Sequence, residues 1–138
     1  MTYNDTCGVR FFAWNNDRSI WKETTGRGVL LYDNSEGTNG TITLYDDVIN
    51  YSYIEIFYRS GNYFRNSGKV EIRGTNLHLG TLTSINPTGG FMYIDCRSVK
   101  VQGTTITTEN HTHAAIENGS TYSNNGNSIF ITRVFGYK

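Results

Sequence analysis

The sequence predicts an all-β protein, an antiparallel β-sandwich of jelly-roll-like type with negligible helix. Runs such as Thr41–Tyr45, Tyr53–Phe57 and Ser128–Thr132 alternate apolar and polar residues. A period of two places one side of a strand on a core and the other side in water. Clusters of Gly, Asn, Asp and Ser separate these runs at intervals of roughly 8–12 residues, which is typical of a sandwich or a barrel.

The composition fits a folded, strand-rich domain. The chain has 138 residues, zero formal net charge and 14% aromatic residues, whereas disordered chains combine high net charge with few aromatics. Lys and Arg are scattered singly, so we expect no nucleic-acid partner. We also expect no membrane insertion, because no apolar run approaches the roughly 18–20 residues that span a bilayer. The N-terminus lacks the pattern of a secretory signal peptide.

Turn residues divide the first half of the chain. Asp33–Gly37 and Thr38–Gly40 contain residues that tolerate positive φ, so strands are expected on either side of them. Asp46–Asn50 is expected to form at most one 3-10 turn. The strands expected in this half cover residues 8–14, 18–22, 28–33, 40–46, 51–59 and 63–73.

In the second half, Asn86–Gly90 holds the single proline and is expected to reverse the chain into a strand that starts at Phe91. The alternation changes phase by one residue between Cys96 and Val99. A β-bulge at Arg97–Ser98 would restore the register. The strands expected here cover residues 77–83, 91–96, 98–102, 104–109 and 128–136.

The alternation also predicts which side chains face the core, and it places His78 on an outward face. The side chains expected to face inward are Val29, Leu31, Ile42, Leu44, Ile54, Ile56, Val70, Ile72, Leu77, Leu79, Met92, Ile94, Cys96, Val99, Val101, Ile129 and Ile131.

The segment from Asn110 to Asn127 does not show the strand pattern. A connection of this length without secondary structure is uncommon and is often functional. We expect either a surface excursion or an arm exchanged within an oligomer.

Residues suited to catalysis are scarce. There is no Gly-x-Ser-x-Gly elbow, and the adjacent Asp46 and Asp47 fit a strand-end turn better than two carboxylates facing each other across a cleft. Cys7 and Cys96 are too few for a disulfide framework and are expected to be reduced thiols. We therefore expect a protein that is not an enzyme.

His111 and His113 form the sharpest local motif. In an extended segment, residues i and i+2 project to the same side, so both imidazoles can meet one metal ion. A threefold axis would bring three such pairs together, an arrangement that holds iron in some phage fibre and spike tips. The alternative is that both are ordinary polar loop residues. Apart from this metal ion, no cofactor is expected.

Aromatic residues near turns are candidates for ligand binding. Trp14, Tyr63 and Tyr122 lie close to Asn, Asp and Thr residues. Flat rings beside such polar groups suit sugar recognition, because sugar ring faces stack and hydroxyls form hydrogen bonds. The alternative is that these rings cover the ends of the sandwich.

A set of strand and turn motifs extends over most of residues 19–138. The motifs are Trp21–Lys22, Leu31–Asn34, Gly40–Leu44, Tyr53–Tyr58, Gly61–Tyr63 and Ile129–Lys138.

Together these motifs resemble the C-terminal domains of tail proteins, tail-fibre and minor structural proteins, of phages and prophages of Gram-positive bacteria. Residues 1–18 fall outside the resemblance and are expected to be an N-terminal strand or a linker stub before a β-sandwich domain at 19–138. The resemblance implies a homotrimeric, receptor-binding virion structural protein on the virion tail, made in the bacterial host cytoplasm. It would bind a host cell-surface glycan or wall polymer beside other tail proteins. The family supplies no ligand residues that can be transferred.

Two alternatives remain open from the sequence. The chain could be a purely structural domain that trimerises or caps a tail fibre. It could also be a fragment of a polysaccharide-degrading tailspike, although it is short and lacks the coil-to-coil repeats of a β-helix.

Overall fold

The fold is known from a computed structural model of the chain, in which the regular structure is almost entirely β-strand. The backbone is described over residues 2–5, 8–15, 20–23, 28–61, 64–88, 91–117, 120–124 and 128–138, and side chains over 28–61, 65–87, 91–116 and 128–138. The described elements are β1 (Thr2–Asp5), β2 (Gly8–Asn15), β3 (Ile20–Glu23), β4 (Val29–Thr38), β5 (Ile42–Thr43), the 3-10 helix η1 (Val48–Asn50), β6 (Tyr53–Ser60), β7 (Phe64–Glu71), β8 (His78–Thr88), β9 (Phe91–Gln102), β10 (Thr105–Glu117), β11 (Ser120–Asn124) and β12 (Ile129–Tyr137).

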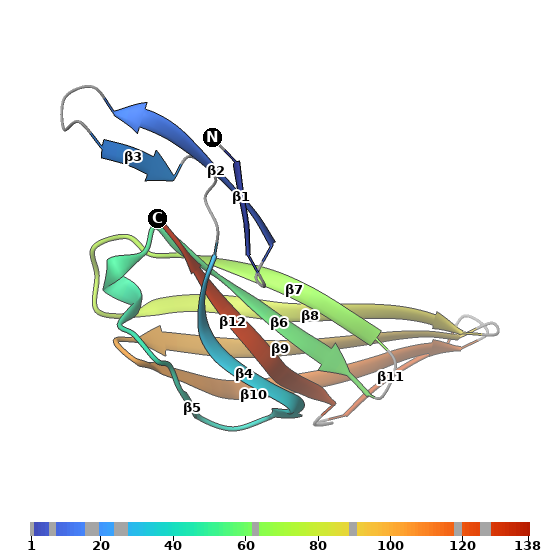
Figure 1. The fold of residues 1–138 in the computed structure, drawn as a ribbon. Coiled ribbons are helices and arrows are strands. Elements are labelled where there is room, and N and C mark those ends of the chain that lie inside the picture. The colour runs from blue at the N-terminus through green and yellow to red at the C-terminus, as the bar shows by residue number, and fades with distance from the viewer. Residues whose placement is uncertain are drawn as a thin grey trace.

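Two antiparallel sheets form the sandwich (Figure 1). One has the strand order β4-β12-β6-β7, and the other has the order β11-β10-β9-β8, with β5 pairing with β10. The predicted all-β fold with negligible helix is confirmed, and so is the short 3-10 turn after Asp46. The jelly-roll likeness stays a prediction. Within the described ranges, no helix has the length and apolar character needed to cross a membrane.

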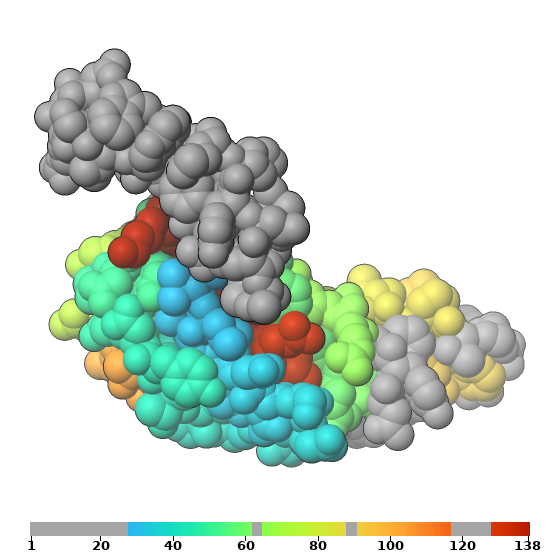
Figure 2. All heavy atoms as spheres, viewed as in Figure 1, coloured from blue at the N-terminus to red at the C-terminus, as the bar shows by residue number. Residues whose placement is uncertain are grey.

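The face seen in Figure 2 belongs to the first sheet, where side chains of β4 and β12 lie side by side. The strands β1, β2 and β3 pair with one another in a third, three-stranded sheet. The pairing of β2 with β3 crosses the predicted boundary at residue 18. The division into 1–18 and 19–138 stays a prediction.

The core lies between the two sheets of the sandwich. Its apolar side chains are almost completely buried, and each contributes about 1.5–3 kcal/mol by leaving water. They are Leu31, Ile42, Leu44, Val48, Tyr51, Ile54, Ile56, Tyr58, Val70, Leu82, Val99, Val101, Ile106, Ile129, Ile131 and Val134.

The inner face changes character along β9. Val101 and Val99 are buried and apolar, Arg97 and Asp95 are buried and polar, and Tyr93 is only half-buried. Figure 1 shows the reason for the change, since β8, β9 and β10 extend beyond the ends of β6 and β7. The interior is therefore apolar at one end of the sandwich and becomes polar and then aromatic toward the other.

The predicted bulge at Arg97–Ser98 is wrong. β9 is continuous, and the irregularity lies in the partner strand, where Thr108 pairs with Val99 but the next paired residue, His111, pairs with Arg97. Asp95 and Arg97 belong to the same inner face as Val99. The phase assigned to residues 92–96 was inverted because those two polar residues were expected to face water.

Several side chains expected inside face outward, and one expected outside is buried. His78 is only 6% exposed, so its neighbours Leu77 and Leu79 lie on the opposite, solvent-facing side of β8. Met92 is exposed because the alternation predicted for residues 92–96 was inverted. Val29 is exposed at the start of the edge strand β4. Ile94 and Cys96 are on the outer face with Met92, and Cys96 carries a free thiol. Cys7 lies outside the described residues.

The segment after Asn110 is not an irregular excursion. β10 continues through Glu117, and β11 pairs with residues 113–117 of β10. The sequence of this segment is rich in Thr, His, Asn and Ser, so hydrophobic alternation does not reveal its strands. The extension of the second sheet past the first is built partly from this hairpin.

We expect Gly136→Ala to lower the free energy of unfolding by about 1–3 kcal/mol through overpacking. A Cβ at position 136 would lie 2.5 Å from Cδ1 of the buried Tyr51. The control is Gly40→Ala, where nothing lies within 4 Å of the added carbon. Its effect should stay within about 0.5 kcal/mol in urea unfolding. Equal losses in the two variants would contradict the described packing of β12 on Tyr51.

Candidate functional site

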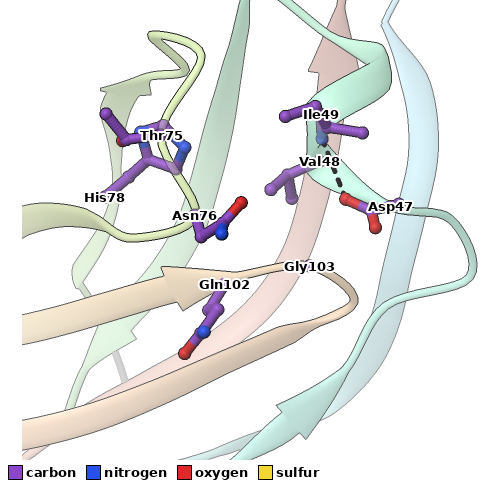
Figure 3. A pocket seen from close by; sticks show the side chains of 8 residues that line it. All are labelled: Asp47, Val48, Ile49, Thr75, Asn76, His78, Gln102 and Gly103. Carbon is purple, nitrogen blue, oxygen red and sulfur yellow. Dashed lines mark hydrogen bonds between the residues drawn. The ribbon is translucent and has the colours of Figure 1, made fainter.

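A pocket of about 310 Å³ opens at the apolar end of the sandwich. We call it the loop pocket. It lies where η1, the loop between β7 and β8 and the turn between β9 and β10 meet (Figure 3). Its lining residues are Asp47, Val48, Ile49, Thr75, Asn76, His78, Gln102 and Gly103.

The η1 side of the loop pocket is fixed by a helix cap and by the core. Asp47 is the N-cap of η1, and its side chain accepts a hydrogen bond of 3.0 Å from the Ile49 amide. The Val48 amide donates to the carbonyl of Gly103 at 3.1 Å, and the Val48 side chain is buried. This hydrogen bond joins two walls of the pocket, so they are held in place before any ligand arrives.

The other two walls depend on turns with left-handed backbone. Gly103, in the turn between β9 and β10, has φ +56°, and Gly74, before Thr75, has φ +57°. Such angles favour glycine because it lacks a Cβ. The Thr75 hydroxyl donates to the carbonyl of Leu77 at 3.0 Å and closes its loop.

Asp46, beside the loop pocket, is committed to holding the loop. Its carboxylate accepts hydrogen bonds from the Tyr51 hydroxyl at 2.8 Å, from Asn50 at 3.0 Å and from the Asp47 amide at 2.8 Å. These bonds, that of Tyr51 first, lower the pKa of Asp46. Burial, together with Asp46, raises the pKa of Tyr51 to about 12. An ionised carboxylate held this way is poorly suited to serve as a general acid.

The side chains of the loop pocket offer both donors and acceptors. The Asn76 amide can donate and accept, and the imidazole of His78 adds two ring nitrogens to the lining. In Figure 3 the Asn76 amide points across the pocket toward Val48. Ile49, which is 55% exposed, adds an apolar surface. The loop pocket can therefore hold a small ligand with hydroxyl groups on an apolar ring.

A second cluster lies deeper, between the sheets, around the carboxylate of Asp95. Ser60, at the end of β6, donates to Oδ2 at 2.6 Å, and Ser128, just before β12, donates to Oδ1 at 2.6 Å. From β10, Nδ1 of His113 lies 2.8 Å from Oδ1 and Nε2 of His111 lies 3.6 Å from it. We call these five residues the Asp95 clamp, because they join the two sheets.

The Asp95 clamp contains Ser, His and Asp but lacks the arrangement of a catalytic triad. In a triad the imidazole stands between the serine and the carboxylate, whereas the Ser128 hydroxyl donates directly to Asp95 and lies 3.4 Å from Nε2 of His111. Asp95 and His111 are also buried. Burial alone would raise the pKa of Asp95, but the hydrogen bonds from Ser128, Ser60 and His113 outweigh it and lower the pKa. The clamp is a structural element.

The two histidines predicted as metal ligands are brought together on one carboxylate. Both lie on β10, and both rings approach Asp95. Among the described residues, no group of three His, Cys, Asp or Glu side chains could hold a metal ion. A metal ion on a threefold axis stays a prediction.

A row of rings continues from the clamp toward the extended end of the second sheet. The Tyr93 ring stacks on His113 with centroids 5.6 Å apart, and the Phe91 ring lies parallel to Tyr93 at 6.1 Å. Neither Tyr93 nor Asp95 was predicted to be a site residue. The available signal was their separation by two residues, which places both side chains on one face of a strand, and His113 lies on the partner strand.

The structure gives little information on the three aromatic residues that were predicted to bind a ligand. Trp14 lies in β2, where its backbone pairs with Trp21, and Tyr122 lies in β11, where its backbone pairs with Ala115. The side chains of Trp14 and Tyr122, and all of Tyr63, lie outside the described residues. Their role in binding stays a prediction.

Comparisons with known proteins add no identification. No protein-family model matches the chain, and no curated protein matches its sequence.

We expect Asp95→Asn to lower the free energy of unfolding by about 1.5–3 kcal/mol at pH 7, because hydrogen bonds to a charged acceptor are weakened. The pKa of Asp95 is lowered in the fold, so its stabilisation is complete above the unfolded value of about 3.8 and is lost as the pH falls through the lower folded value. The difference between wild type and variant should shrink below about pH 3.8.

Urea unfolding between pH 2 and 7 measures this difference. The control is Asp33→Asn, whose exposed carboxylate lies 3.7 Å from Arg133 and should contribute less than about 1 kcal/mol. A difference that does not change with pH would contradict the clamp.

Proposed function

We propose that this protein is a non-enzymatic receptor-binding module of a phage tail and that it recognises host cell-surface carbohydrate through the loop pocket. On this proposal it works as a homotrimer on the virion tail, beside other tail proteins, after synthesis in the bacterial host cytoplasm. The motifs over residues 19–138 support the family assignment. The loop pocket supports the kind of ligand.

The observation that carries the proposal is the mixed lining of the loop pocket. Sugar hydroxyls both donate and accept, as the amide of Asn76 does. A sugar ring also has a face of C–H groups that can lie on the exposed part of Ile49. A volume of about 310 Å³ suits a ligand of one or two sugar units.

The walls of the loop pocket are preformed, which favours ligand binding even when the contact area is small. Its walls are already joined by the hydrogen bond from Val48 to Gly103 and by the cap at Asp47. A preformed site loses less conformational entropy when the ligand binds. Three weak sites on one particle would then gain through effective concentration.

The lining also favours binding over hydrolysis. Glycosidases need two carboxyl groups separated by roughly 5–9.5 Å, one of them protonated. Among the described lining residues, Asp47 supplies the single carboxylate, and the nearby Asp46 has a lowered pKa.

We expect Asn76→Ala to weaken binding to a host-wall oligosaccharide about tenfold or more, since a pair of hydrogen bonds in the pocket is lost. The matched control is Asn110→Ala, an exposed amide five residues beyond Thr105 along β10 and so about 17 Å from this end of the strand. Glycan arrays followed by calorimetry give the affinities. Equal losses in both variants, or none in either, would place recognition elsewhere.

A second candidate function is structural, as an assembly domain of a tail fibre, and the outer face of the second sheet favours it. Ile85 pairs with Ile94, which pairs with Ala114, and these residues form an apolar row across β8, β9 and β10. Ile85 is 59% exposed, and Leu79 on the same face is 70% exposed. Apolar patches of this kind often mark contacts between proteins, and here the partner would be a second copy of the chain.

If the protein is an assembly domain, we expect wild type to have a solution mass of several chains of 15.6 kDa each rather than that of one chain. Ile85→Lys should reduce the mass to that of a monomer, because a buried charge without a partner is costly. The control, Thr41→Lys, adds the same charge at an exposed position before β5. Light scattering after gel filtration measures the mass, and a monomeric wild type would reject the candidate.

A further inference from the structure

The charge in the lining of the loop pocket is negative. Among its lining residues Asp47 has a carboxylate, and neither Lys nor Arg is present. Asp46, the preceding residue, adds a second carboxylate next to the pocket. The charged group in the lining is thus anionic, and Lys138 is close enough to Asp46 outside the lining to contribute to the lowered pKa of that carboxyl.

The carboxylate of Asp47 is held at the wall of the loop pocket. One oxygen accepts from the Ile49 amide, and the other faces the turn at Gly103, where a Cβ would lie 3.7 Å from it. The hydrogen bond from the Ile49 amide keeps the charge beside η1, and the second oxygen lies on the side of the Gly103 turn. A phosphate or carboxylate on a ligand would approach this charge without a basic partner among the lining residues, and like charges repel more strongly in a partly buried site than in bulk water.

The remaining lining groups suit uncharged hydroxyls. His78 is 6% exposed, and its ring has no hydrogen-bond partner among the described residues. A hydroxyl can accept from the protonated nitrogen of the ring or donate to the other one. The Asn76 amide provides the same dual capacity.

We infer that the loop pocket is specific for an uncharged sugar unit and discriminates against phosphate- or carboxylate-bearing wall polymers. This inference rests on the proposed function and adds to it the chemical class of the ligand. Asp47 is the residue that determines the specificity, because its charge repels anionic ligands. His78 and Asn76 form the hydrogen bonds to uncharged ligands.

The test uses matched pairs of immobilised oligosaccharides of glucose, galactose, rhamnose and N-acetylglucosamine, each without and with a phosphate or carboxylate group. Wild type should bind the uncharged member of its preferred pair about tenfold more tightly or better. Asp47→Asn keeps the helix cap, since Asn is as good an N-cap as Asp. In this variant the ratio of the affinities for the uncharged and the anionic member should fall to about threefold or less.

Asn76→Ala is the contrasting variant and should weaken binding to both members of the pair. Thermal unfolding of each variant shows whether its fold is intact. Equal or tighter binding of the anionic member by wild type would overturn the inference and leave the proposed function standing. Undiminished discrimination in Asp47→Asn would overturn the role of Asp47. A wild type that binds no member of any pair would overturn the proposed function, and the inference with it.

Discussion

The burial of apolar side chains between the two sheets is the constraint on which the rest of the structure depends. Residues such as Ile54, Ile56 and Val101 are completely buried at one end of the sandwich. Val48 and Tyr51 join this core from η1 and its C-cap, so a loop segment is attached to the packed interior. The η1 wall of the loop pocket is therefore attached to the core through Val48.

The other end of the interior is held together by polar contacts. Asp95, Arg97 and Tyr58 make hydrogen bonds from one sheet to the other or to the loops between them. Buried polar groups need such partners, because an unsatisfied one costs free energy. Directional bonds thus replace apolar packing where the second sheet extends past the first. On the proposed function, the ligand binds at the apolar end, while the polar contacts join the two sheets at the other end.

Alternation in the sequence predicts the fold class and much of the apolar core, because strands such as β6 and β12 bury their apolar residues in the expected phase. It fails on β9, where Asp95 and Arg97 face inward, and on β8, where His78 does. No pattern of hydrophobicity can place a buried polar residue whose partners come from distant strands. For the same reason the His-x-His motif was located but its contact with Asp95 was not. The loop pocket was missed because Asp47, Asn76 and Gln102 are separated in sequence and meet only in the fold.

On the proposed function, a preformed pocket at the apolar end recognises an uncharged sugar. Titration of ¹⁵N-labelled protein with the uncharged oligosaccharide that it binds best, followed by amide NMR, reports which residues the sugar contacts. Saturable shifts are expected at Asp47, Ile49, Asn76 and Gly103, with the amides of Phe91 and Tyr93 unchanged. Saturable shifts confined to the region of Phe91 and Tyr93, or none at all, would show that the loop pocket does not bind the sugar.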